Sequence, residues 1–229
     1  MKTLKYLIGA AASVAVLAMG GSAFAAIEGS MHDLTDATGG ASDLTTSADN
    51  QYCSFCHTPH SNGTLTPLWN RAEKTSGTYT MYTSATIAGA QQTDPVGVSA
   101  ACLSCHDGVT ALDVMYNAPT LTSGTYRNLA TAATQTYTWS LGDGAINPAV
   151  VVGTDLSNDH PISITYGADS AMETLANIQL PASGLTLYGG SNNQVECGTC
   201  HNPHDPTNVP FLRIDNTGSA LCMTCHIDK

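Results

Sequence analysis

The chain contains the stretch Cys53-Ser54-Phe55-Cys56-His57, in which two cysteines two residues apart are followed at once by a histidine. C-x-x-C-H is the attachment motif of c-type haem: the thiols form thioethers to the porphyrin and the histidine is the proximal iron ligand. Three further stretches have the same form: Cys102-Leu103-Ser104-Cys105-His106, Cys197-Gly198-Thr199-Cys200-His201 and Cys222-Met223-Thr224-Cys225-His226. We number the motifs, and the haems they predict, 1 to 4 in chain order.

The four motifs use all eight cysteines of the protein and predict four covalently bound haem c groups. The residues expected to hold the porphyrins are Cys53, Cys56, Cys102, Cys105, Cys197, Cys200, Cys222 and Cys225. The expected proximal ligands are His57, His106, His201 and His226. Disulfides and paired zinc sites are the alternatives, but neither explains why a histidine follows every second cysteine.

The N-terminus reads as a cleaved signal peptide. Lys2 and Lys5 precede an apolar run from Leu7 to Met19, and Ala23-Phe24-Ala25 is an A-x-A cleavage site. An uncleaved anchor is the alternative, and the apolar run is short for a membrane span. We expect an exported protein, extracellular or at the cell surface, with the periplasm as the alternative.

The mature chain is strongly acidic. Without Lys2 and Lys5 it has five Lys and Arg against eighteen Asp and Glu, a net charge of −13. This charge argues against nucleic acid and anionic lipid as partners. Large aliphatic side chains are scarce, so the chain is poorly placed to bury a core of its own. The fold expected is a multihaem cytochrome c, mostly coil with short helices and minimal strand, wrapped around stacked haems.

Few regular elements are expected. Helices are predicted at 99–116, 170–177 and 219–226, weak strands at 78–83 and 137–141, a turn at 155–162 and a hairpin at 189–190. The expected organisation is a signal peptide (1–25), an N-terminal arm (26–52), a first di-haem module (53–116) and a loop-rich region with a second di-haem module (117–229), all within one compact domain.

The two halves of the chain repeat. Each contains an isolated histidine, then C-x-x-C-H-x-P-H, then a plain C-x-x-C-H. The spacings between motifs differ between the halves, so the repeat is a haem-pair unit with variable loops and not a solenoid of fixed period.

Four histidines lie outside the motifs, one for each haem: His32, His60, His160 and His204. We expect them to be the distal ligands, which gives bis-histidine ligation with no open iron position. The alternative is surface histidines with methionine ligands, but the methionines occupy no repeated position. Those available are Met31, Met81, Met115, Met172 and Met223.

His60 and His204 each lie three residues after a proximal histidine, so neither can reach the opposite face of the same haem. We therefore expect His60 on haem 2 and His204 on haem 4. The repeat then gives His160 to haem 3 and leaves His32 for haem 1. Because His32 lies on an N-terminal arm, it can also ligate a haem of a neighbouring copy, which would give an open head-to-tail filament.

The runs CSFCHTPH (53–60), PLWNR (67–71) and NDHPI (158–162) resemble exported multihaem cytochromes of metal-reducing bacteria. Four haems with an N-terminal histidine arm are most similar to the OmcE-type tetrahaem cytochromes, which form extracellular filaments. The resemblance covers the motifs and the ligand histidines, while the loops carry little family signature. It implies haems stacked along a filament axis, with His32 capping a haem of the next copy.

The expected function is electron transfer and not catalysis. The expected partners are other copies of the chain, redox partner cytochromes and extracellular metal oxides. Two rivals remain: a monomeric periplasmic electron carrier, and a multihaem reductase of nitrite, hydroxylamine or a similar substrate. A reductase needs an open iron position, and the histidine count leaves none.

Overall fold

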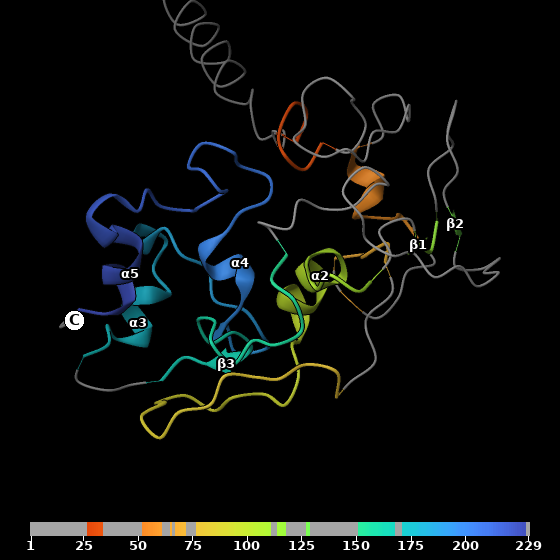
Figure 1. Ribbon diagram of the computed structural model, residues 1–229. Coiled ribbons are helices and arrows are strands. Elements are labelled where there is room, and N and C mark those ends of the chain that lie inside the picture. The colour runs from red at the N-terminus through yellow and green to blue at the C-terminus, as the bar shows by residue number, and fades with distance from the viewer. Residues whose placement is uncertain are drawn as a thin grey trace, which may run out of the picture.

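The computed structural model describes residues 27–33, 52–60, 65, 67–71, 77–110, 114–117, 127–128, 151–167 and 171–227. This part of the chain is mostly irregular, with short helices and two-residue strands (Figure 1). The expectation of a coil-rich fold with little strand is confirmed. The strand expected at 137–141 lies outside the described residues.

The helices are short, and four of them carry or adjoin a C-x-x-C-H motif. The α-helices are α2 (Gly97–His106), α3 (Leu175–Ile178), α4 (Cys197–Cys200) and α5 (Ala220–Cys225). The 3-10 helices are η1 (Tyr52–Phe55), η4 (Pro181–Ser183) and η5 (Thr217–Ser219).

The strands form two separate pairs. β1 (Val114–Met115) lies parallel to β2 (Arg127–Asn128), with Val114 opposite Arg127. β3 (Ile164–Thr165) lies antiparallel to β4 (Gln194–Val195), with Ile164 opposite Val195. The β3–β4 pair joins the segment that follows His160 to the segment that leads into motif 3.

α2 and α4 lie side by side at the centre of the molecule (Figure 1). The backbone N–H of Cys197, the first residue of α4, donates to Oγ of Ser99 in α2 at 2.9 Å. A Cβ atom added to Gly198 would lie 2.8 Å from a methyl carbon of Val98 and 2.6 Å from the hydroxyl of Tyr188. A glycine inside motif 3 therefore permits the helices of motifs 2 and 3 to approach closely.

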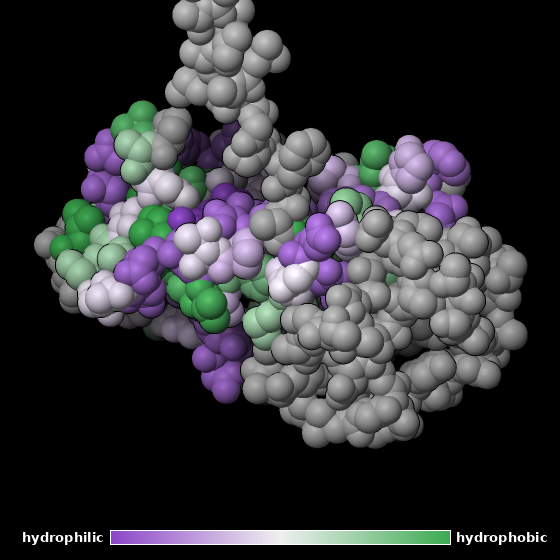
Figure 2. All heavy atoms as spheres, turned by 90° about the horizontal axis from the view of Figure 1, so that it is seen from above, coloured by the Kyte–Doolittle hydropathy of each residue, from purple (hydrophilic) through white to green (hydrophobic). Residues whose placement is uncertain are grey.

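The apolar core is small. One cluster of buried residues consists of Tyr166, Ile178 and Leu187, with Met172, Leu175, Val195 and Cys225 packed against it. On the face that Figure 2 shows, hydrophobic residues lie in small groups separated by hydrophilic ones. No helix within the described ranges is both long and apolar enough to cross a membrane.

Several predicted elements are present with different bounds. α2 ends at His106, ten residues before the predicted helix end, because Asp107 accepts hydrogen bonds from the N–H groups of Val109 and Thr110 and Gly108 has φ +71°. The helix predicted at 170–177 is α3, displaced towards the C-terminus, with Thr174 as its N-cap. No strand forms at 78–83, where Thr80 makes one isolated bridge to Asp155.

The other local predictions are confirmed. The terminal helix is present as η5 and α5. At the predicted hairpin, Tyr188 pairs with Gln194 around Gly189, whose φ is +78°. In the predicted turn, the Ser157 N–H donates to Oδ1 of Asp155 at 3.1 Å.

Candidate haem-binding site

Each C-x-x-C-H motif lies on or directly after one turn of helix. Motif 1 overlaps η1, motif 2 closes α2, motif 3 contains α4, and motif 4 closes α5. One helical turn brings the two cysteines of each motif to the same side of the chain. All eight cysteines are free, so none is used in a disulfide.

The proximal histidines of motifs 1, 2 and 4 each face a histidine from outside the motifs. The ring centroids of His57 and His204 are 6.1 Å apart, with an interplanar angle of 38°. Those of His106 and His32 are 6.2 Å apart at 86°. Those of His226 and His160 are 6.3 Å apart at 70°.

This spacing fits an iron atom held between two imidazoles. Two metal–imidazole bonds of about 2 Å, plus the distance from each nitrogen to its ring centre, put the centroids of two axial imidazoles about 6 Å apart. The spacing of the three pairs is therefore compatible with bis-histidine haem ligation, and a C-x-x-C pair lies beside each proximal histidine.

The facing rings differ from the distal pairing expected from sequence. His204 faces the proximal histidine of motif 1 and not that of motif 4, while His160 faces motif 4 and not motif 3. His32 faces His106 of motif 2 in the same chain and not His57 of motif 1. The physical reason is the same in each case: the ligand comes from whichever segment folds across the motif, and tertiary packing decides which segment that is.

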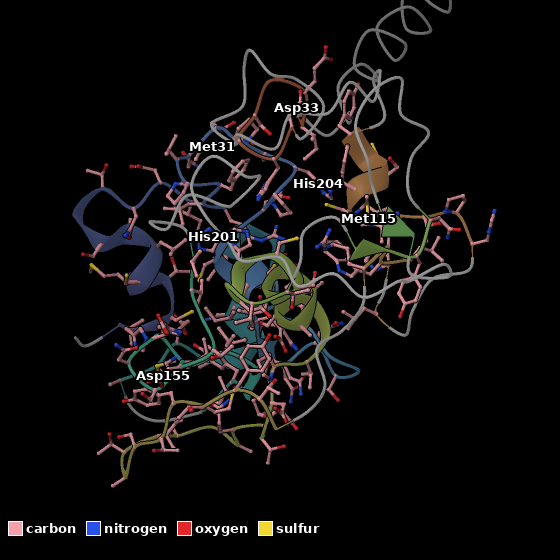
Figure 3. The ribbon with its side chains drawn as sticks, turned by 45° about the vertical axis from the view of Figure 1, so that its right-hand side comes forward. Met31, Asp33, Met115, Asp155, His201 and His204 are labelled. Atoms are coloured by element: carbon pink, nitrogen blue, oxygen red, sulfur yellow. The ribbon has the colours of Figure 1, made fainter. Side chains whose placement is uncertain are left out.

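Burial keeps two of the distal imidazoles neutral, the form that binds iron. Burial, and then His106, lower the pKa of His32 to about 4. Burial, and then His57, lower the pKa of His204. Figure 3 shows His201 and His204 below the turn that carries Met31 and Asp33, and both histidines are exposed to solvent.

In both C-x-x-C-H-x-P-H units a proline carbonyl orients the proximal imidazole. Nδ1 of His57 lies 2.8 Å from the carbonyl oxygen of Pro67, and Nδ1 of His201 lies 2.9 Å from that of Pro210. When Nδ1–H donates to a carbonyl, Nε2 is left as the metal-binding nitrogen.

The backbone has the same conformation and hydrogen bonds after Pro67 as after Pro210. The residues after the prolines, Leu68 and Phe211, have φ of +51° and +61°. Their carbonyls accept from the N–H of Thr58 and of Asn202 at 2.9 and 2.7 Å. His57 bridges to Trp69 as His201 bridges to Leu212. The sequence repeat is therefore also a structural repeat, and it extends beyond H-x-P-H.

Sequence reasoning missed the second copy of this segment. It noted Pro67-Leu68-Trp69 but did not match it to Pro210-Phe211-Leu212. The signal was available: a proline followed by two large apolar residues lies ten residues after one proximal histidine and nine after the other.

Trp69 lies against a proximal histidine. Its ring meets that of His57 edge-on at 5.6 Å, and its Nε1–H donates to Oγ of Ser104 at 3.1 Å. Since Ser104 lies between the cysteines of motif 2, Trp69 ties motif 1 to motif 2.

The four motifs form one connected set. Thiols of Cys56 and Cys105 are close enough to interact electrostatically, as are those of Cys200 and Cys225. The thiols of Cys102 and Cys197 are also close enough to perturb each other's pKa, raising that of Cys102 and lowering that of Cys197. Motifs 1 and 3 are also linked through the facing rings of His57 and His204.

The geometry does not favour a metal–thiolate site. No group of three or more His, Cys, Asp or Glu side chains able to hold a metal ion occurs in the described ranges, which include all eight cysteines and all eight histidines. Burial raises the pKa of Cys56 to about 12 and of Cys200 to about 11.

Comparison with known families supports the haem interpretation. The family described as "Doubled CXXCH motif" matches residues 191–229, which contain motifs 3 and 4. No curated protein gives a significant match. The matched motifs indicate covalently bound c-type haem and suggest a multihaem c-type cytochrome, a class of protein that transfers electrons.

Proposed function

We propose that this protein transfers electrons through four bis-histidine c-type haems, outside the cytoplasmic membrane, as a polymeric filament of identical chains. The observation that carries the electron-transfer part is the set of three facing histidine pairs at 6.1 to 6.3 Å, each beside a C-x-x-C pair. Two protein ligands on an iron leave no position for a substrate, which favours electron transfer over catalysis.

The fourth ligand pair follows from the structural repeat. His204 follows motif 3 and faces the proximal histidine of motif 1. The equivalent residue after motif 1 is His60, and the equivalent proximal histidine is His201. A reciprocal exchange between the two H-x-P-H units therefore assigns His60 to haem 3. All eight histidines then have a role, and the H-x-P-H step couples haem 1 to haem 3.

Haem iron, once attached, supplies one-electron redox chemistry. The side chains of this protein hold and tune that group. The proline carbonyls of both H-x-P-H units accept from proximal imidazoles, which makes those imidazoles stronger donors to iron and favours the ferric state. The connected motifs give electrons a continuous route between neighbouring sites.

The export and filament parts of the proposal rest on the sequence. The leader indicates export, and the resemblance to OmcE-type cytochromes favours a filament that delivers electrons to partner cytochromes or extracellular metal oxides. The position of His32 beside His106 favours ligation of haem 2 within its own chain. Exchange of His32 into a neighbouring copy is the alternative that the experiment below separates.

Purified protein tests the proposal in three steps. Haem content, measured as the pyridine haemochrome, should be four per chain, and the oxidised protein should be low-spin without carbon monoxide binding. Negative-stain electron microscopy should show filaments. Monomers with four low-spin haems would exclude the filament and leave the soluble carrier. Filaments that persist in His32→Ala, with haem 2 high-spin, would place His32 in its own chain.

A further inference from the structure

Phe211 makes a contact with a distal ligand that is not needed for ligation itself. Its phenyl ring is stacked on the imidazole of His32, with ring centroids 4.5 Å apart and an interplanar angle of 23°. Phe211 is 9% exposed, so this contact is shielded from water. Offset stacking at this distance is an attractive aromatic contact, and it restricts rotation of both rings.

The stacked imidazole has a distinctive orientation. The planes of His32 and His106 are 86° apart, close to perpendicular, whereas those of His57 and His204 are 38° apart. The relative orientation of two axial imidazoles decides which iron d orbitals they split, and hence the electronic state of a low-spin haem. An imidazole is otherwise free to turn about its bond to iron, so a perpendicular arrangement needs a neighbour that holds it.

Phe211 is itself held firmly. Its carbonyl accepts from the N–H of Asn202 at 2.7 Å, and its φ of +61° is unusual for a bulky residue. The neighbouring Pro210 carbonyl contacts Nδ1 of His201. The ring that stacks on the His32 imidazole is therefore part of the loop that orients the proximal ligand of haem 3.

We propose that Phe211 is a positioning residue that sets the plane of the His32 imidazole perpendicular to that of His106 and thereby tunes haem 2. The proposal rests on the proposed function, because it requires His32 and His106 to ligate one iron. It also links haems 2 and 3, since one loop fixes the distal ligand of haem 2 and the proximal ligand of haem 3.

Low-temperature electron paramagnetic resonance of the fully oxidised holoprotein tests this role. Near-perpendicular imidazoles give a strongly anisotropic low-spin ferric signal, and more nearly parallel imidazoles give a rhombic one. In wild type the His32–His106 and His160–His226 haems should both contribute to the anisotropic signal. Phe211→Leu should shift the contribution of the His32–His106 haem towards the rhombic form. The contribution of the His160–His226 haem should stay unchanged. Phe211→Tyr, which keeps the ring, should retain the wild-type spectrum.

The controls separate positioning from general damage. Val209 lies in the same loop and is 78% exposed, so Val209→Ala should leave the spectrum unchanged. Phe211→Met keeps a large apolar side chain without a ring and repeats the test if Phe211→Leu does not accumulate. An unchanged spectrum in a ringless variant carrying four haems would overturn the role of Phe211 alone. Fewer than four haems in wild type, or a wild-type spectrum in His32→Ala, would instead count against the proposed function.

Discussion

His57 and His204 belong to different motifs, yet their imidazoles face each other at 6.1 Å. We predict that His204→Ala converts haem 1, and no other, to a high-spin form that binds carbon monoxide. This pair has the smallest interplanar angle of the three, 38°, so the variant should lose a rhombic low-spin signal in electron paramagnetic resonance.

His160→Ala is the matched control for that prediction. Its ring is 70° from that of His226, so its loss should remove part of the anisotropic signal and leave the rhombic one. If His204→Ala lost an anisotropic signal instead, the pairing of motif 1 with His204 would be wrong.

Asn70 is a buried residue that joins two segments beside motif 1, and it is 0% exposed. Its Nδ2 donates to the carbonyls of Ser54 and Asn117, at 2.5 and 2.7 Å, and its Oδ1 accepts from the Asn117 N–H at 2.8 Å. Asn70→Leu removes all three hydrogen bonds to these partly buried backbone groups. We expect a loss of about 3 kcal/mol in the free energy of unfolding.

Urea unfolding of the loaded protein, followed by circular dichroism, measures that loss. Ser157→Ala is a suitable comparison, because the Ser157 side chain is exposed and should cost well under 1 kcal/mol. A similar midpoint for the two variants would mean that Asn70 is not a structural link.

The identity of the ligands could be read from single residues, but their pairing could not. C-x-x-C-H names the cysteines and the proximal histidine because covalent chemistry fixes their spacing. His204 is only three residues from His201, so it cannot be the distal ligand of haem 3. This spacing does not show which of the other three haems it faces. That depends on contacts such as the one between Cys197 and Ser99, which are 98 residues apart in sequence.

At the scale of elements, the position of helix ends follows from local chemistry. The Asp107–Gly108 pair stops α2, because the aspartate carboxylate accepts from the next N–H groups and glycine adopts φ +71°. The Asp107–Gly108 pair is visible in the sequence, but the helix was predicted to continue to residue 116 because apolar residues recur at helical spacing beyond it. The two-residue strands could not be predicted, because their pairing depends on tertiary contacts.

Glu196 caps α4, the helix of motif 3, and is 1% exposed. Burial raises its pKa, against hydrogen bonds from Ser99 and Ser163 that lower it. A carboxyl whose folded pKa lies above its ordinary value of 4.5 destabilises the fold as pH rises from 4.5 through the raised pKa. We predict that Glu196→Gln gains stability relative to wild type across that window, with the difference constant above it.

Glu173→Gln is the control of opposite sign. The Thr174 N–H and then the Asn177 side chain lower the pKa of Glu173, so this carboxylate contributes stability that is lost as pH falls through its lowered pKa. Urea midpoints of the three proteins from about pH 2.5 to 8 measure both effects, with the Glu173 effect at the acid end of that range. A Glu196→Gln curve parallel to that of wild type would contradict the assigned cause.

At the scale of the whole molecule, the described elements are too small to hold each other in place. The longest helix has ten residues, and the strands have two each. Helices shorter than about 12 to 15 residues are marginal in water without tertiary packing. The buried cluster of Tyr166, Ile178 and Leu187 is small, and Cys225 of motif 4 packs against it. Four porphyrins would supply the missing apolar contacts at every motif.

Folding should therefore depend on haem attachment. We predict that the mature chain made without cytochrome c maturation shows no cooperative urea transition by far-ultraviolet circular dichroism, while the matured chain from the same host does. Replacing both cysteines of motif 3 should also be more damaging than replacing those of motif 4, because α4 packs on α2 and His204, which follows motif 3, faces His57 of motif 1. Cooperative unfolding of the haem-free chain would show that the polypeptide alone specifies the fold, and the haems would then be attached to a scaffold that exists without them.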